Sequence, residues 1–323
     1  MQKTMSKHMI IFSGSHHPKL AEDVAKKLGT KVSNSNLRYF ANGEIKCQLG
    51  ESVRGADVFI FQTHSPSVNN AIMEQAMMID AAKRASARHI TAICPLYGYA
   101  RQDRKSQGRE PITAKLVANI FRVAGVDRIV SMDLHTGQIQ GFFDGPFDHL
   151  IAMPEIIAYL KKKYKRDCII VSPDAGRVKA AERYAAKLGS DLAIVHKKRV
   201  NGSNAAEVSH LIGDVKGRNC VIVDDMIDGG GTMAAAASQL HDSGAKSIVI
   251  AATHGIFSAP AADRLAQAPI DEIIVTDTSP LPSEMAALSN VRVVSIAGVL
   301  ANAVNAIFRN NTISGIFDDQ NYS

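Results

Sequence analysis

Residues 221–233 read VIVDDMIDGGGTM. An apolar run ends in Asp224 and Asp225, and Asp228 then leads into three glycines, Thr232 and an alanine-rich segment. A short Val/Ile run bounded by turn residues is typical of a buried parallel strand. Glycines allow a tight turn in which backbone N–H groups converge, and the N-terminus of a helix adds partial positive charge. The stretch therefore predicts a strand, an anion-binding turn over 228–232 and a helix.

The same alternation of strand and helix continues on both sides of this stretch. Strands alternating with helices predict an α/β fold built on mainly parallel sheets flanked by helices. At about 100–200 residues per domain, the chain length favours two domains. We place the boundary near residues 147–153, which gives domains over 8–150 and 151–323, and we expect the last helix to pack back on the first domain. The other strand-like runs are 8–14, 56–62, 89–97, 127–135, 168–174, 192–199, 247–255, 272–277 and 291–298.

The amino-acid composition limits the classes of protein to which this chain can belong. Hydrophobic residues make up 46% and charged residues 21%, which fits a soluble globular enzyme. The net charge of +6 favours anionic ligands, but the basic residues are dispersed, so we expect no nucleic-acid partner. The four cysteines are isolated and are expected to be reduced in a cytoplasmic protein. No apolar run approaches the ~18 residues of a membrane span, and no secretory signal is present.

The candidate binding and catalytic residues lie just after the strands, because ligands of parallel sheets bind beyond the carboxyl ends of the strands. The pair Asp224 and Asp225 suits sugar hydroxyl groups or a Mg²⁺ ion, and the glycine turn suits a phosphate. A phosphorylated sugar meets both demands. The alternative is a glycine-rich turn with solvated aspartates. No Walker A sequence and no G-x-G-x-x-G after a strand occurs, so neither of these nucleotide-binding turns is expected.

Four further stretches accompany this one: YFANGEIKCQL (39–49), YGYARQDRK (97–105), DLHTGQIQGFFD (133–144) and VSPDAGRVKAAERYAAKLG (171–189). Together with residues 221–232 they resemble the ribose-phosphate pyrophosphokinase (PRPP synthetase) family, which has the type I phosphoribosyltransferase fold. The resemblance spans nearly the whole chain. It implies that ATP and ribose 5-phosphate react to PRPP and AMP, with one or two Mg²⁺ ions, one of them carried as Mg-ATP. Such a transfer depends on positioning and charge stabilisation.

The resemblance also implies roles for individual residues. Asp224 and Asp225 would bind ribose hydroxyls, and Asp228, Gly229, Gly230, Gly231 and Thr232 the 5-phosphate. Phe40, Asn42 and Glu44 would form an adenine pocket completed by a neighbouring subunit, although Asn-Gly alone also predicts a hairpin turn. Arg101 and Gln102 would hold the nucleotide, with Asp103, Arg104 and Lys105 on the same loop. His135 and Asp174 would bind Mg²⁺, and Lys197 and Arg199 on a mobile loop would be catalytic.

The family commonly forms homohexamers that respond to phosphate and ADP, and Ser52, Arg54, Ser86 and Ser314 resemble that effector site. Three residues depart from the usual pattern: Arg177 replaces glycine, His196 replaces aspartate and Gly229 replaces threonine. Arg177 could tighten phosphate binding or crowd the entrance. Two other interpretations stay open. One is an ordinary phosphoribosyltransferase, which has no use for Phe40, Arg101, Gln102 and His135. The other is a non-catalytic associated subunit, which would be expected to lose catalytic residues.

Overall fold

The computed structural model describes residues 7–164, 167–198 and 208–313. These residues separate into two compact units. The first unit holds residues 7–151, 278–280 and 296–313, and the second holds the remaining described residues. Each unit is an α/β structure around its own parallel sheet, so the predicted fold class is confirmed.

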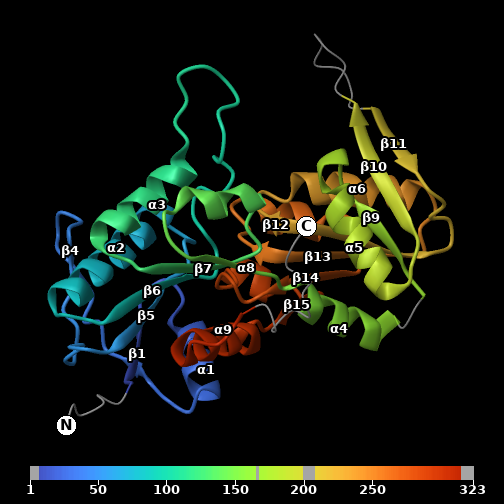
Figure 1. The fold of residues 1–323 in the computed structure, drawn as a ribbon. Helices are drawn as coiled ribbons and strands as arrows, with labels where there is room; N and C mark the ends of the chain where they lie inside the picture. The colour runs from blue at the N-terminus through green and yellow to red at the C-terminus, as the bar shows by residue number, and fades with distance from the viewer. Residues whose placement is uncertain (1–6, 165–166, 199–207, 314–323) are drawn as a thin grey trace. The chain divides into compact units, whose positions relative to one another are not determined.

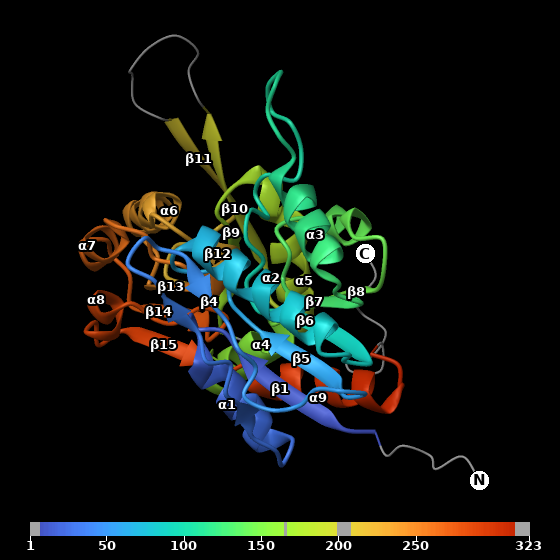
Figure 2. The same ribbon diagram turned by 90° about the vertical axis from the view of Figure 1, so that its left-hand side faces the viewer.

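The sheet of the first unit is entirely parallel. Its order is β2(Val32–Ser33), β1(Met9–Ser13), β5(Asp57–Phe61), β6(His89–Cys94), β7(Arg128–Met132) and β8(Phe147–Leu150). All five residues of the central strand β5 are buried, because helices cover both faces of the sheet. As Figures 1 and 2 show, α2(Val68–Arg84) and α3(Thr113–Ala124) cover one face, and α1(Pro18–Lys27) and α9(Ala297–Arg309) cover the other.

A small hairpin and a short helix complete the first unit. Strands β3(Arg38–Tyr39) and β4(Ile45–Lys46) pair antiparallel, with Tyr39 opposite Ile45. Gly43 in the turn has a φ of +88°, a conformation that glycine adopts without steric cost. The hairpin predicted from Asn-Gly is therefore present. The 3-10 helix η1(Gly137–Phe142) follows β7.

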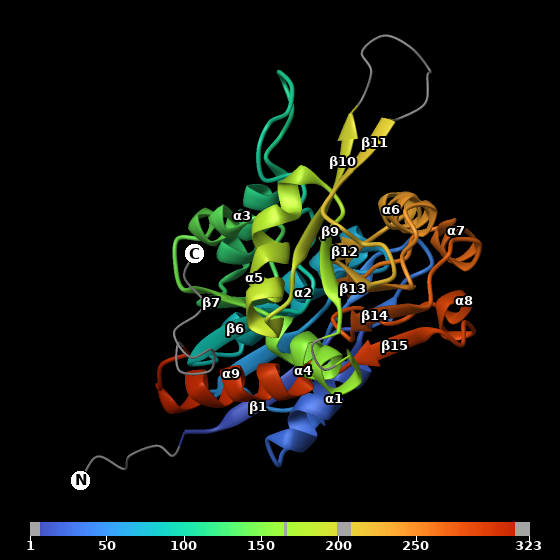
Figure 3. The same ribbon diagram turned by 90° about the vertical axis from the view of Figure 1, so that its right-hand side faces the viewer.

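The sheet of the second unit is parallel except at one edge, where the first two strands form an antiparallel ribbon (Figure 3). Its order is β11(Val208–Ile212), β10(Leu192–Lys198), β9(Ile169–Ser172), β12(Asn219–Ile227), β13(Ser247–Gly255), β14(Glu272–Thr276) and β15(Val291–Val294). The helices are α4(Met153–Tyr164), η2(Ala175–Arg177), α5(Val178–Leu188), α6(Gly231–Asp242), α7(Ala261–Ala266) and α8(Ser283–Ala286).

Strand β12 separates two hydrophobic cores in the second unit. Val221 and Val223 face the core formed with α4 and α5, whereas Cys220 and Ile222 face the core formed with α6, α7 and α8. This division follows from the two-residue period of a strand. A sheet covered on both faces needs apolar residues at every position, which is why the run CVIV is continuous.

Three short strands were missed from the sequence, and one expectation was wrong in detail. β2, β8 and β11 were not predicted, and β8 occupies residues inside the expected boundary region. Asp224 and Asp225 were expected after the end of a strand, but β12 continues to Ile227, because β13 runs beside it as far as Gly255. All four cysteines are free thiols. Among the described helices, none is both long and apolar enough to cross a bilayer.

Candidate active site

The turn after β12 has the geometry expected of an anion site. Helix α6 begins at Gly231, and Gly230 before it has a φ of +71° and caps the helix. A Cβ atom on Gly230 would lie 3.1 Å from Cγ of Leu265. Only glycine therefore fits this position without strain. The predicted order of strand, glycine turn and helix is confirmed, and it directs the helix N-terminus toward the turn.

The sequence did not predict the cation that lies beside this turn. Arg264 of α7 is exposed, and its Nη1 donates a hydrogen bond to the backbone oxygen of Gly229. The same atom lies 3.5 Å from the positions that Cβ atoms on Gly229 or Gly231 would take. The guanidinium therefore supports the loop and adds positive charge next to it. Nothing in the local sequence PAADRLAQ indicates this role, because only the packing of α7 against α6 brings Arg264 to the loop.

Asp224 and Asp225 meet one arginine. Nε of Arg177 lies 3.0 Å from Oδ1 of Asp224, and Nη2 lies 2.6 Å from Oδ2 of Asp225. The aspartate side chains are 11% and 9% exposed. Burial and the neighbouring Asp225 carboxylate raise the pKa of Asp224, while the charge of Arg177 opposes this rise. The two carboxylates thus have a built-in counter-charge.

Asp174 caps the short helix that carries Arg177. Its Oδ1 accepts hydrogen bonds from the backbone N–H groups of Gly176, at 2.8 Å, and Arg177, at 3.2 Å. The carboxylate is partly exposed and offers the hard oxygen atoms that Mg²⁺ prefers. Within the described ranges, no three His, Cys, Asp or Glu side chains gather into a metal site.

In the first unit, the β3–β4 hairpin presents an aromatic face. Phe40 is 53% exposed at the start of the turn, and its backbone N–H donates to the oxygen of Glu44 at 2.8 Å. Oδ1 of Asn42 accepts from the backbone N–H of Glu44 at 3.1 Å, so part of Asn42 serves the turn itself. An exposed ring on an ordered turn can stack on a planar base.

The loops after β6 and β7 are joined by a buried carboxylate. Oδ2 of Asp103 accepts hydrogen bonds from Oγ1 of Thr136 at 2.7 Å and Nε2 of Gln138 at 2.6 Å. Asp103 is 7% exposed, so its role is structural. The bonds bring the loop of Arg101 and Gln102 to the loop of His135. Oε1 of Gln102 accepts from Oγ1 of Thr113 at 2.6 Å.

The remaining predicted residues lie in three places. The backbone of Lys197 is in β10, opposite Ser209 of β11, and His196 is opposite His210. Arg199 and Ser314 lie outside the described residues. Ser52, Arg54 and Ser86 are exposed, and the backbone N–H of Gly55 donates to the oxygen of Ser86 at 2.9 Å. The turn holding Ser52 and Arg54 therefore contacts Ser86, as a shared site would require.

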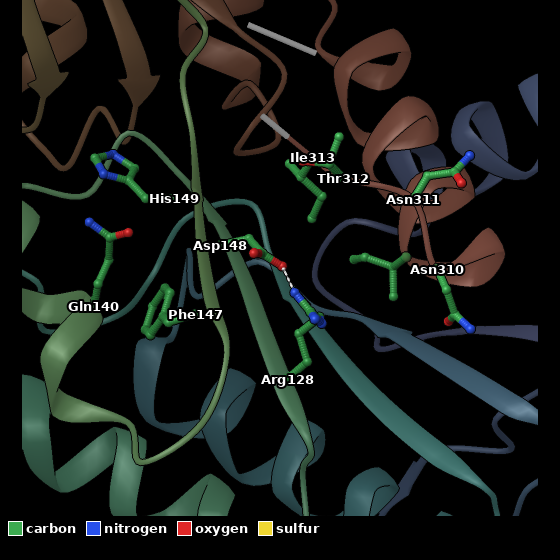
Figure 4. A pocket seen from close by; sticks show the side chains of 10 residues that line it. Arg128, Gln140, Phe147, Asp148, His149, Asn310, Asn311, Thr312 and Ile313 are labelled. Carbon is green, nitrogen blue, oxygen red and sulfur yellow. Dashed lines mark hydrogen bonds and ion pairs between the residues drawn. The ribbon is translucent and has the colours of Figure 1, made fainter. Parts of the chain in front are cut away.

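A separate pocket of about 480 Å³ lies at the β8 edge of the first unit (Figure 4). An ion pair between Arg128 and Asp148, at 2.5 Å, forms part of its wall, and Asn310 and Thr312 contribute polar groups. Burial raises the pKa of Asp148 despite the charge of Arg128. None of the predicted site residues that the structure describes lines this pocket.

Comparisons with known proteins agree with this geometry. Residues 9–125 match the N-terminal domain of ribose phosphate pyrophosphokinase, and residues 207–318 match the phosphoribosyl synthetase-associated domain. The ribose-phosphate pyrophosphokinase of Streptomyces avermitilis is 52% identical over 99% of both chains. That of Corynebacterium glutamicum is 51% identical over 98% of both chains. The crystal structure of phosphoribosylpyrophosphate synthetase from Mycobacterium smegmatis covers 94% of this chain and 100% of its own, with 50% identity and a TM-score of 0.89. The chain therefore belongs to the ribose-phosphate pyrophosphokinase family.

Proposed function

We propose that this chain transfers the β,γ-diphosphoryl group of ATP to the 1-hydroxyl of ribose 5-phosphate, giving PRPP and AMP for nucleotide biosynthesis. The observation that carries the proposal is the Asp224–Asp225 pair followed by a glycine turn at the start of α6. Carboxylates accept hydrogen bonds from hydroxyls, and a helix N-terminus binds phosphate. A phosphorylated sugar needs both groups together.

The second unit would bind ribose 5-phosphate. The backbone N–H groups of residues 228–232 and the hydroxyl of Thr232 would hold the 5-phosphate, with Arg264 adding charge. Asp224 and Asp225 would accept the ribose hydroxyls, which orients the 1-hydroxyl for attack. Lys197 and Arg199 would neutralise charge on the diphosphoryl group in the transition state.

The first unit would bind ATP. Phe40 would stack on adenine, Asn42 and Glu44 would contact its edge, and Arg101 and Gln102 would hold the nucleotide and its phosphates. Arginine suits this task because its fork binds two phosphate oxygens at once. Asp174 of the second unit is an expected Mg²⁺ ligand, and His135 would bind the Mg²⁺ carried with ATP. When bound, that ion would neutralise the phosphate oxygens during transfer.

The assembly follows from the same family resemblance. We infer a cytoplasmic homo-oligomer, a hexamer, in which the Phe40 hairpin completes the adenine pocket of a neighbouring subunit. Phosphate and ADP would act as effectors at Ser52, Arg54, Ser86 and Ser314. A phosphate-titrated rate curve would test the effector site, and competition with ATP as the only effect of ADP would contradict it.

A phosphorus NMR time course tests the reaction. The protein is mixed with ATP, ribose 5-phosphate and Mg²⁺, and we expect AMP together with the doublet pair of a pyrophosphoryl sugar. Lys197→Ala should nearly abolish the reaction. Lys161→Ala, on an exposed position of α4, is the matched control and should keep it. ADP instead of AMP would mean single phosphoryl transfer, and no turnover by folded protein would favour a non-catalytic subunit.

A further inference from the structure

The contact between Arg177 and the two aspartates of β12 goes beyond the assignments above. Successive side chains on a strand normally point to opposite faces of the sheet. Asp224 and Asp225 are successive, yet both carboxylates reach the same guanidinium, at 3.0 Å and 2.6 Å. The backbone N–H of Asp225 also donates to Oδ1 of Asp224 at 2.8 Å, which draws the two groups together. The arginine and both aspartates therefore form one buried cluster.

Two adjacent buried carboxylates are stabilised by a shared proton or by a cation beside them. Two adjacent carboxylates that are each about nine-tenths buried repel one another and have lost most of their hydration. A divalent ion between them is one solution, and a guanidinium is another. Arg177 is itself only 20% exposed, and its planar fork can serve two carboxylates at once, which a lysine cannot do. Arg177 is thus a cation beside the pair that the chain itself provides.

Arg177 is held from two directions. Its side chain binds the aspartate pair, and its backbone N–H donates to Oδ1 of Asp174 at 3.2 Å.

We propose that Arg177 is a positioning residue of the ribose site, which fixes Asp224 and Asp225 as hydroxyl acceptors without a metal ion between them. The inference rests on the proposed function, because it assigns the pair to ribose hydroxyls. It predicts that Arg177 governs the affinity for ribose 5-phosphate and has little part in the diphosphoryl transfer. It also predicts that Mg²⁺ serves the nucleotide and leaves the aspartate pair unchanged.

The first measurement is the split between KM and kcat. For Arg177→Gln we expect KM for ribose 5-phosphate to rise about tenfold at saturating Mg-ATP, with kcat within about threefold of the unchanged protein. Arg177→Lys keeps the charge but loses the fork, so its KM should lie between the two. Arg183→Gln, an exposed arginine of α5, removes the same charge and should leave KM unchanged. An equal fall in kcat and kcat/KM for Arg177→Gln would overturn the inference.

The second measurement is calorimetric titration of ribose 5-phosphate into the protein, in EDTA and in Mg²⁺, without nucleotide. The unchanged protein should bind equally well in both, within about twofold, whereas Arg177→Gln should bind weakly in EDTA and regain affinity in Mg²⁺. Binding by the unchanged protein only in Mg²⁺ would contradict the inference while leaving the proposed reaction intact. No turnover in the NMR assay and no binding under either condition would instead contradict the proposed function itself.

Discussion

The hydroxyl of Tyr39 donates a hydrogen bond to Oε1 of Glu74, 2.6 Å away, and so ties the β3–β4 hairpin to helix α2. Glu74 is completely buried. Its carboxylate also accepts hydrogen bonds from two groups of Ser15, the backbone N–H at 3.0 Å and the side-chain Oγ at 2.7 Å. Because Phe40 follows Tyr39 directly, this buried carboxylate sets the position of the exposed ring that we assign to adenine. The ATP site that we propose in the first unit would thus depend on a residue in the interior.

Tyr39→Phe tests this dependence. The substitution removes one oxygen, and we expect KM for ATP to rise about three- to tenfold, because a loosened hairpin presents Phe40 less well. Tyr159→Phe is a matched control, since Tyr159 makes a similar bond to Oε1 of Glu272, at 2.7 Å, in the second unit. Steady-state kinetics should show an unchanged KM for ATP in the control. Equal KM values in both variants would contradict the positioning role.

Glu74 also makes the first unit sensitive to acid. Burial alone would raise the pKa of Glu74, but hydrogen bonds from His16, Tyr39 and Ser15 outweigh it and lower the pKa to about 2. A carboxyl group whose pKa is lowered by folding stabilises the folded protein at pH values above its unfolded pKa, 4.5. This stabilising free energy is lost as the pH falls toward the folded pKa of about 2. Between pH 5 and pH 3 the loss should be about 2 kcal/mol. Urea unfolding of the unchanged protein and of Glu74→Gln measures it, since the glutamine variant should lack this part of the pH dependence. Parallel curves for the two proteins would show that Glu74 does not carry the effect.

The long buried strands could be predicted from the sequence, because a strand that is buried on both faces consists of a continuous run of apolar residues. The order of β12, the glycine turn and α6 was expected, because an apolar run, three glycines and an alanine-rich segment follow one another in the sequence. β8 was missed because Asp148 and His149 interrupt its pattern, and β2 because two residues carry no period. The contacts made by Arg177, Glu74 and Arg264 connect segments that lie far apart in the chain. No local pattern encodes such contacts, so only the folded structure reveals them.

Asp103→Ala tests the link between the loops after β6 and β7. The substitution leaves Thr136 and Gln138 without their buried acceptor, so the free energy of unfolding should fall by about 1–3 kcal/mol. KM for ATP should also rise, because the loops of Arg101 and His135 would lose their common anchor. Asp127→Ala is the comparison: its Oδ2 accepts from the backbone N–H of Ile90 at 2.7 Å. This variant should lose stability without a change in KM for ATP. A normal KM in Asp103→Ala would assign Asp103 to stability alone.

Gly229 and Gly230 are neighbours in the glycine turn, yet they should respond oppositely to a larger residue. Gly229 lies outside the left-handed region, and a Cβ atom there would meet only Nη1 of Arg264, at an ordinary 3.5 Å. Gly229→Thr should therefore fold normally and lower KM for ribose 5-phosphate about two- to threefold, because the new hydroxyl can donate to the 5-phosphate. Gly230→Thr requires a φ of +71° and brings Cβ within 3.1 Å of Leu265, so it should lose stability and raise KM. Steady-state kinetics and thermal unfolding of both variants separate the cases. If Gly229→Thr also raised KM, the threonine hydroxyl would have no acceptor in this turn, and the 5-phosphate would have to lie elsewhere.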